Sequence, residues 1–107
     1  MKRHIAELEG HLLVCIAGLA SKAYGVSIQQ EIQKRGGAIS LGMTHSALTR
    51  LEEIGLLKSW LGDASPARGN RRKRFFELTD RGRVTLHEMQ DLREERWKLS
   101  TDFLHAQ

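Results

Sequence analysis

The chain of 107 residues contains one cysteine, one proline and few aromatic side chains. A single cysteine excludes an intramolecular disulfide and favours a reducing, cytoplasmic environment. It is Cys15, which lies in an apolar helical pattern and is therefore predicted to be an inert core thiol. One proline and a charged fraction of 28% with both signs mixed argue against wholesale disorder.

Long apolar stretches are also lacking. The longest runs from Leu12 to Ala20, too short to span a bilayer, and it is interrupted by a glycine. Residues 1–4 are basic, but Glu7 and Glu9 precede the apolar run, which argues against a signal peptide. The sequence therefore predicts a cytoplasmic protein with no membrane partner.

Patterns typical of enzymes and metal sites are missing as well. The five histidines are scattered, and no acidic cluster accompanies them at metal-ligand spacing. The sequence contains no GxGxxG, P-loop or GxSxG pattern. Cys15 has one candidate base at helical spacing, His11, and such a histidine is more often exposed or satisfied than catalytic. We therefore expect no enzyme activity, no metal and no cofactor.

What the sequence does have is positive charge in one place. The net charge is +4 and the isoelectric point is about 9.6, which suits a polyanionic partner. Residues 68–74 carry five cations in seven residues and no acid. A charge run alone is usually a solvated loop, so its meaning depends on the elements around it.

The N-terminal half predicts a structural helix followed by a helix-turn-helix pair. A stripe of isoleucines and leucines indicates the first helix over 5–20. Ser27 and Gln30 have capping-box spacing at the start of a second helix, which stops at the glycines of 36–37. A third helix, predicted over 40–54 and ended by a glycine, completes the pair.

The third helix is apolar on one side and rich in hydrogen-bonding groups on the other. Helical spacing puts Thr44, Leu48 and Leu51 on one face. The DNA major groove accepts a helix of this kind. The residues predicted to contact DNA from this helix are Thr44, His45, Ser46, Thr49 and Arg50. Arg50 has an alternative, which is an ion pair with Glu52 or Glu53.

The next segment predicts a β-hairpin with a long basic tip. Residues 56–61 are β-prone, 62–70 hold turn formers, and 74–79 form the returning strand, with Phe76 and Leu78 on one face. Cations at the tip would neutralise phosphates, and glycine and asparagine beside them let the backbone approach a groove. The basic run 68–74 is the arm of this hairpin. Its predicted DNA contacts are Arg68, Asn70, Arg71, Arg72 and Lys73.

The C-terminal segment predicts one long helix that the small domain cannot cover by itself. In a short chain, the expected partner of its exposed apolar stripe is a second copy of the protein. The predicted dimer-interface residues are Met89, Leu92, Arg96, Trp97, Leu99 and Phe103. Trp97 and Trp60 could stack a small hydrophobic effector, or they could be plain interface and core anchors. The domains are thus 1–79, which binds DNA, and 80–107, which dimerises.

Four motifs extend this interpretation: AYGVSI at 23–28, SLG at 40–42, ALTRLEEIGLLKS at 47–59 and RKRFFELTDRG at 72–82. Their order resembles the PadR-like family of bacterial transcriptional regulators. The resemblance implies a winged helix, a homodimer through the C-terminal helix, and repression relieved by an effector. It also implies that Tyr24 contacts a phosphate or braces the domain. His45 and Ser46 stand where the family commonly has tyrosine and proline.

These features predict a mainly α fold with a small β-hairpin, a winged helix-turn-helix plus a long C-terminal dimerisation helix. The predicted function is sequence-specific binding of double-stranded DNA by a homodimeric transcriptional regulator, acting as a repressor. The alternative is a winged-helix protein-interaction module without specific DNA binding. The charge density of the arm favours DNA, because it exceeds what protein contacts usually need.

Overall fold

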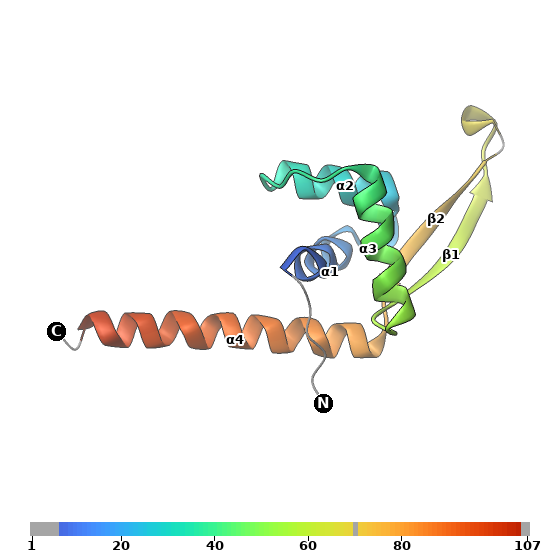
Figure 1. Ribbon diagram of the computed structural model, residues 1–107. Coiled ribbons are helices and arrows are strands. Elements are labelled where there is room, and N and C mark those ends of the chain that lie inside the picture. Colours follow the sequence, from blue (N-terminus) through green and yellow to red (C-terminus); the bar gives the residue numbers. More distant parts are fainter. Residues whose placement is uncertain (1–6, 70, 106–107) are drawn as a thin grey trace.

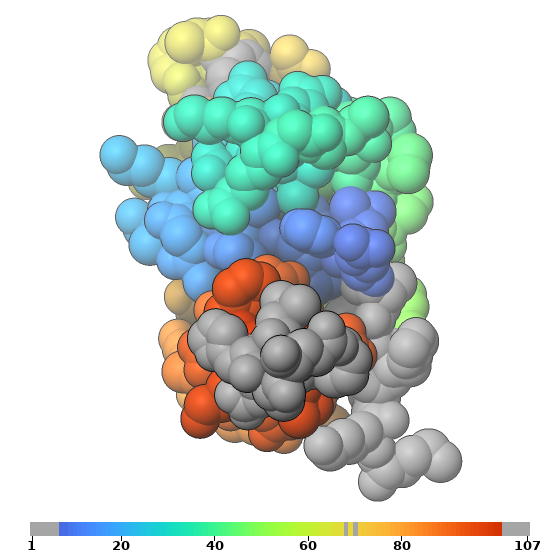
Figure 2. Space-filling view, turned by 90° about the vertical axis from the view of Figure 1, so that its left-hand side faces the viewer, coloured from blue at the N-terminus to red at the C-terminus, as the bar shows by residue number. Residues whose placement is uncertain are grey.

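The computed structural model describes residues 7–69 and 71–105, with the side chains of Arg68 and of 102–105 outside the description. The elements follow in the order α1 (Glu7–Leu19), η1 (Ala20–Lys22), α2 (Gly25–Lys34), α3 (Leu41–Glu53), β1 (Leu57–Ala64), η2 (Pro66–Arg68), β2 (Arg72–Leu78) and α4 (Asp80–His105). The first three α-helices form one body, from which the hairpin and α4 extend on different sides (Figure 1). Seen along α4, the helices α4, α1 and α2 stack in layers (Figure 2). The predicted mainly α fold with one hairpin and a long last helix is confirmed.

Glycine ends both helices of the helix-turn-helix pair. Gly36 follows α2 with φ 90°, and Gly55 follows α3 with φ 84°, a left-handed conformation that glycine adopts without strain. At each end, the N–H of the glycine and the N–H after it donate to carbonyl oxygens of the last helical turn over 3.0 Å. These paired bonds satisfy groups that a helix end leaves open. Both helices therefore stop where the sequence predicted.

The helix starts are more varied. Ser40 caps α3 as predicted, because its hydroxyl oxygen accepts the N–H of Met43 at 3.0 Å. The start of α2 was predicted at Ser27 but lies earlier, at Gly25. Ser27 is the third residue of α2, and its hydroxyl oxygen accepts the N–H of Tyr24, the residue before the helix, at 2.9 Å. The serine therefore stabilises the start of the helix from within its first turn. The prediction identified the right side chain and the wrong position for it.

The hairpin is a two-stranded antiparallel sheet that begins in the core and ends in solvent. Leu57 pairs with Leu78 at its base, and Trp60 pairs with Phe75 further out. The register shifts beyond Leu61, and both strands continue past the predicted bounds. The N–H of Phe76 also donates to the carbonyl oxygen of Ala23 at 2.9 Å, which ties β2 to the start of α2.

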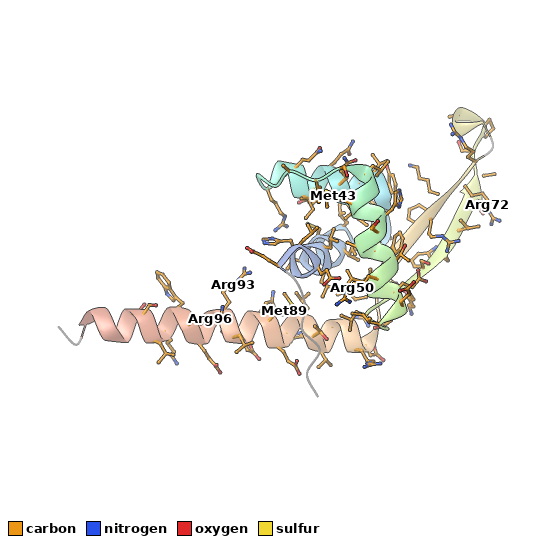
Figure 3. The ribbon with its side chains drawn as sticks, viewed as in Figure 1. Met43, Arg50, Arg72, Met89, Arg93 and Arg96 are labelled. Atoms are coloured by element: carbon orange, nitrogen blue, oxygen red, sulfur yellow. The ribbon has the colours of Figure 1, made fainter. Side chains whose placement is uncertain are left out.

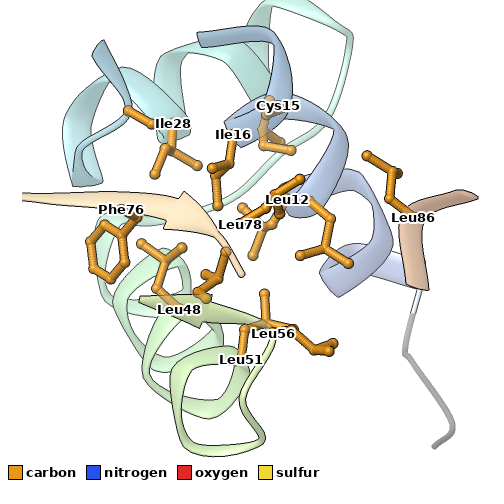
Figure 4. Close-up of a cluster of buried hydrophobic side chains, with 14 of the residues drawn as sticks. Leu12, Cys15, Ile16, Ile28, Leu48, Leu51, Leu56, Phe76, Leu78 and Leu86 are labelled. Atoms are coloured by element: carbon orange, nitrogen blue, oxygen red, sulfur yellow. The ribbon is translucent and has the colours of Figure 1, made fainter. Parts of the chain in front are cut away.

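One hydrophobic core joins the helices to the base of the hairpin (Figure 4). Its members come from α1, α2, α3, both strands and the start of α4. The labelled ones are Leu12, Cys15, Ile16, Ile28, Leu48, Leu51, Leu56, Phe76, Leu78 and Leu86. Phe76 and Leu78 share the buried face of β2, as the alternation of the sequence predicted. The core also holds α1 at the centre of the body.

Helix α4 leaves this core after its first turns. Leu86 is buried and Met89 is half-buried, whereas residues 91–100 are all exposed. The helix has 26 residues, which makes it about 39 Å long at roughly 1.5 Å per residue. The molecule accordingly extends 63 Å along its longest axis and 31 Å and 21 Å along the others. More than half of α4 thus projects beyond the body.

Gly82→Ala is expected to destabilise the fold by about 2 kcal/mol. A Cβ at Gly82 would overlap the carbonyl oxygen of Leu56, a backbone atom that cannot rotate away. Chemical denaturation would measure the loss in the free energy of unfolding. The matched control is Gly18→Ala, since Gly18 lies in α1 with nothing within 4 Å of the added atom. That change should stabilise by about 1 kcal/mol through helix propensity. Equal stability of both variants would contradict the close approach of α4 to Leu56.

Candidate nucleic-acid interface

The buried face of α3 is the one that helical spacing predicted. Thr44, Leu48 and Leu51 are all 0% exposed. The Thr44 hydroxyl donates to the carbonyl oxygen of Ser40 at 2.9 Å, so its polar atom is satisfied inside the protein. The prediction that Thr44 contacts DNA is therefore wrong for its side chain. The apolar stripe to which it belongs already placed it on the inner face.

The centre of the exposed face of α3 carries small side chains. Residues of a helix are spaced by about 100°, so Gly42, Ser46 and Thr49 fall on one line opposite the buried face. All three are exposed. Because these side chains are absent or short, the helix backbone can come close to base edges in a major groove, and the two hydroxyl groups can form hydrogen bonds there. Ser46 and Thr49 thus lie on the exposed face of α3, as helical spacing predicted.

His45 lies on one edge of this line, against the start of α2. A Cβ at Gly25 would stand 2.7 Å from Cε1 and 3.2 Å from Nε2 of His45, so the imidazole fills the space that a side chain would need. Gly25 is the first residue of α2. The open N–H groups and the positive end of a helix favour an anion there. His45 and the start of α2 together suit a backbone phosphate.

Arg50 lies on the other edge of α3, on the side toward α1 (Figure 3). Its Nε is 3.1 Å from Oε2 of Glu9 in α1. The sequence alternative that Arg50 pairs with Glu52 or Glu53 is wrong, because the carboxylate that meets it comes from a distant helix. Glu52 instead accepts the hydroxyl of Ser59 in β1, at 2.7 and 2.9 Å.

Met43 is a candidate that the sequence analysis missed. It lies seven residues before Arg50, hence on the same edge of α3, and it is 53% exposed in the first turn of the helix. Apolar side chains at such positions can contact the methyl group of thymine. The sequence analysis considered only polar side chains for base contacts. Helical spacing alone, however, places Met43 outside the buried stripe of α3 and next to Gly42.

The β1–β2 hairpin is the wing of this fold, and three aromatic rings and a lysine fix it to the helices. The Tyr24 ring meets Phe75 edge-on with centroids 5.8 Å apart, and Trp60 stacks on Phe75 at 6.1 Å. The Lys73 ammonium stands 3.9 Å from the centroid of the Tyr24 ring. Of the two roles that the resemblance implied for Tyr24, this position corresponds to bracing. Lys73 lies in the same joint, so its charge is held close to the start of α2.

The remaining cations of the arm lie on both sides of Lys73 along the chain, Arg71 and Arg72 toward the tip and Arg74 toward the base of the hairpin. Arg71 and Arg72 are exposed, and Arg72 donates through Nε to the carbonyl oxygen of Gly62 at 2.7 Å, which holds it along the hairpin (Figure 3). Arg74 sits in the strand and donates to the Ser59 hydroxyl oxygen at 3.0 Å. The predicted contact Asn70 lies outside the described residues, as does the side chain of Arg68.

The residues predicted for a dimer interface divide into two groups. Met89 packs against Gly10 of α1, where a Cβ would overlap its methyl group, so it belongs to the core side of α4. Leu92, Trp97 and Leu99 are 49%, 74% and 69% exposed, and Arg96 is exposed too. The side chain of Phe103 lies outside the description. The projecting part of α4 therefore presents large apolar groups to solvent.

The single cysteine, Cys15, is a free thiol buried in the core. Burial raises the pKa of the Cys15 thiol, which keeps the poorly nucleophilic protonated form. In the parts of the chain that the structure describes, no three His, Cys, Asp or Glu side chains gather as a metal site would require. None of the helices described combines the length and apolarity that crossing a bilayer demands.

Comparison with known proteins places this architecture. Residues 12–88 match the model of the family described as "Transcriptional regulator PadR-like family". A PadR family transcription regulator from Clostridium difficile R20291 is 27% identical with a TM-score of 0.71, over 90% of this chain and 97% of that chain. A PadR-like transcriptional regulator from Bacillus cereus ATCC 14579 is 22% identical with a TM-score of 0.73, over 91% and 90% of the two chains.

A third similar structure is Bacillus subtilis PadR in complex with operator DNA, at 16% identity and a TM-score of 0.69, over 79% of this chain and 47% of that chain. No curated protein matched the sequence. The family match spans most of the chain, from α1 into α4, and it agrees with the motifs of the sequence. The chain therefore belongs to the PadR-like family, whose members are transcriptional regulators and not enzymes.

Proposed function

We propose that the protein is a homodimeric repressor that acts in the cytoplasm by binding a two-fold symmetric operator in double-stranded DNA. The observation that carries this proposal is the continuity of one surface. His45 of α3 touches Gly25 at the start of α2, and Tyr24 before it touches Phe75 and Lys73 of the wing. Three elements that suit DNA are thus held in a fixed relation.

The surface divides the work of binding. Ser46, Thr49 and Met43 face the bases, because they lie on the exposed side of the first turns of α3. The start of α2, His45 and the cations of the wing face phosphates, which position a protein without reading sequence. The operator complex of Bacillus subtilis PadR supports a DNA partner for this shared architecture.

The projecting part of α4 supports the homodimer. Leu92, Trp97 and Leu99 would gain burial from a second copy, and residues 80–107 would then form the dimerisation segment beside a DNA-binding domain of 1–79. Two copies would present their α3 helices about one duplex turn, or ~34 Å, apart. Trp97 offers a flat apolar face on which a small hydrophobic effector could stack within that seam.

Loss of wing charge tests the contact with phosphates. Arg71→Gln with Arg72→Gln should lower operator affinity and flatten the dependence of log K on log salt by about 4, because two phosphate contacts are lost from each copy of the dimer. Filter binding across a salt series measures both quantities. Lys34→Gln with Arg35→Gln removes the same charge from the far end of α2 and serves as control. An unchanged slope in the wing variant would exclude the wing from the interface.

Leu99→Glu tests the dimer. The added carboxylate would be buried in the apolar seam, so we expect a monomer in sedimentation equilibrium and a loss of operator affinity of at least about 100-fold. Thermal stability of the body should hardly change, since Leu99 is 69% exposed in the single chain. Lys98→Glu introduces the same group at a neighbouring position that faces another way. A dimeric Leu99→Glu protein would refute this seam.

Met43 can be tested on the DNA side. Replacing thymine by uracil at single operator positions removes one methyl group, and about a fourfold loss of affinity is expected where Met43 touches it. The same replacement should have no effect on Met43→Ala. Leu41→Ala, which alters another exposed side chain of the first turn, should keep the effect of the methyl group. Sensitivity that persists in Met43→Ala would assign the methyl contact to a different residue.

A further inference from the structure

Among the described residues, the buried side chain that carries a full charge is that of Glu9 in α1, a residue only 5% exposed. Removing a carboxylate from water is unfavourable unless a cation and hydrogen bonds compensate it. Glutamine or leucine could fill this position in an ordinary core. The charge at Glu9 therefore calls for a reason beyond packing, and its partner indicates one.

One partner of Glu9 is Arg50 of α3, on the same edge as Met43. Oε2 of Glu9 lies 3.1 Å from Nε of Arg50, and the two side chains are 6% and 49% exposed respectively. A guanidinium group has five N–H donors, and Nε–H is the one nearest the chain. The ion pair places Glu9 at the end of the group nearest the chain, and the half-exposed Arg50 side chain keeps surface for a contact outside the protein.

Glu9 also lies at the junction of three helices. The next residue, Gly10, is the one against which Met89 of α4 packs. In the labelled view, Arg50 reaches from α3 and Met89 from α4 toward α1 (Figure 3). The position of Arg50 is therefore set by the same stretch of α1 that seats α4.

We propose that Glu9 is a positioning residue of the DNA interface, which orients the Arg50 guanidinium to contact a backbone phosphate on the α1 side of the major groove. This inference rests on the proposed function. An arginine held in one rotamer before binding loses less freedom when it meets the phosphate. The carboxylate also repels DNA, which weakens binding. The two effects have opposite signs, so an experiment can separate them.

The experiment compares wild type, Glu9→Gln, Arg50→Gln and the double variant on a selected operator and on a scrambled duplex of equal length, across a salt series. Arg50 would reach its phosphate only when α3 is seated in the groove of its operator, so loss of this charge-assisted hydrogen bond should lower the operator-to-scrambled affinity ratio of Glu9→Gln by at least about tenfold. Its salt slope on the operator should flatten by about 2, although the variant is more positive, because one phosphate contact is lost from each copy of the dimer. The double variant should be no worse than Arg50→Gln alone.

The matched control is Glu31→Gln. It breaks a similar pair, Glu31 with Arg35, in which Nε and Oε1 are 3.3 Å apart and the arginine is also 49% exposed. Glu31 lies in α2 and Arg35 directly follows that helix, and the control should leave ratio and slope unchanged. Thermal melts establish that each variant is folded. If Glu9→Gln is not, Arg50→Lys keeps the charge but removes the planar guanidinium that Glu9 would orient, and it should show the same lower ratio.

A purely repulsive Glu9 would give the opposite result. Glu9→Gln would then bind operator and scrambled duplex more tightly by the same factor. An unchanged affinity ratio and a salt slope that does not flatten would overturn the inference. Additive effects of the two single changes would overturn it as well. A wild-type protein with no preference for any operator would instead refute the proposed function, and the positioning role with it. An operator preference of Glu9→Gln equal to that of the wild type would refute the positioning role alone.

Discussion

The structure depends on the burial of α1 between α4 and the helix-turn-helix pair. Leu12, Leu13 and Ile16 are at most 2% exposed, and they contribute to a core shared with α2, α3 and the hairpin. A helix of this kind has little amphipathic character of its own, because it is covered on several sides. Its burial supplies the apolar area on which a domain this small depends. Every surface proposed to meet DNA or a second copy is attached to it.

A second constraint acts at the base of the wing. A two-stranded hairpin is marginal by itself, so its direction must be fixed by what it touches. Tyr24 and Phe75 meet edge-on, and the N–H of Phe76 donates a hydrogen bond to the carbonyl oxygen of Ala23. Tyr24 thereby forms an isolated antiparallel bridge with Phe75. Lys73 over the Tyr24 ring places a cation in the same joint. The hairpin is therefore oriented by the helices rather than by its own two strands.

Sequence reasoning recovered those parts of the fold that local rules determine. Glycines at helix ends, the cap at Ser40 and the alternation in β2 all depend on neighbours within a few residues. The same rules predict that Thr44 faces the core, where it lies, so a DNA contact by this side chain does not follow from them. The ion pair between Arg50 and Glu9 lay beyond such rules, because it joins helices far apart in the chain. Met43 was overlooked because base reading was sought only among polar groups.

The seating of α4 has a mechanical consequence. From Met89 to the end of the helix the chain rises about 24 Å at roughly 1.5 Å per residue. A tilt of about 5° at Met89 moves the far end by about 2 Å over that length. In the proposed dimer each copy carries such a lever, pivoted where a methionine side chain rests on a glycine. Methionine adapts its shape readily, so the distance between the two DNA-binding faces is adjustable at this pivot without rebuilding either core.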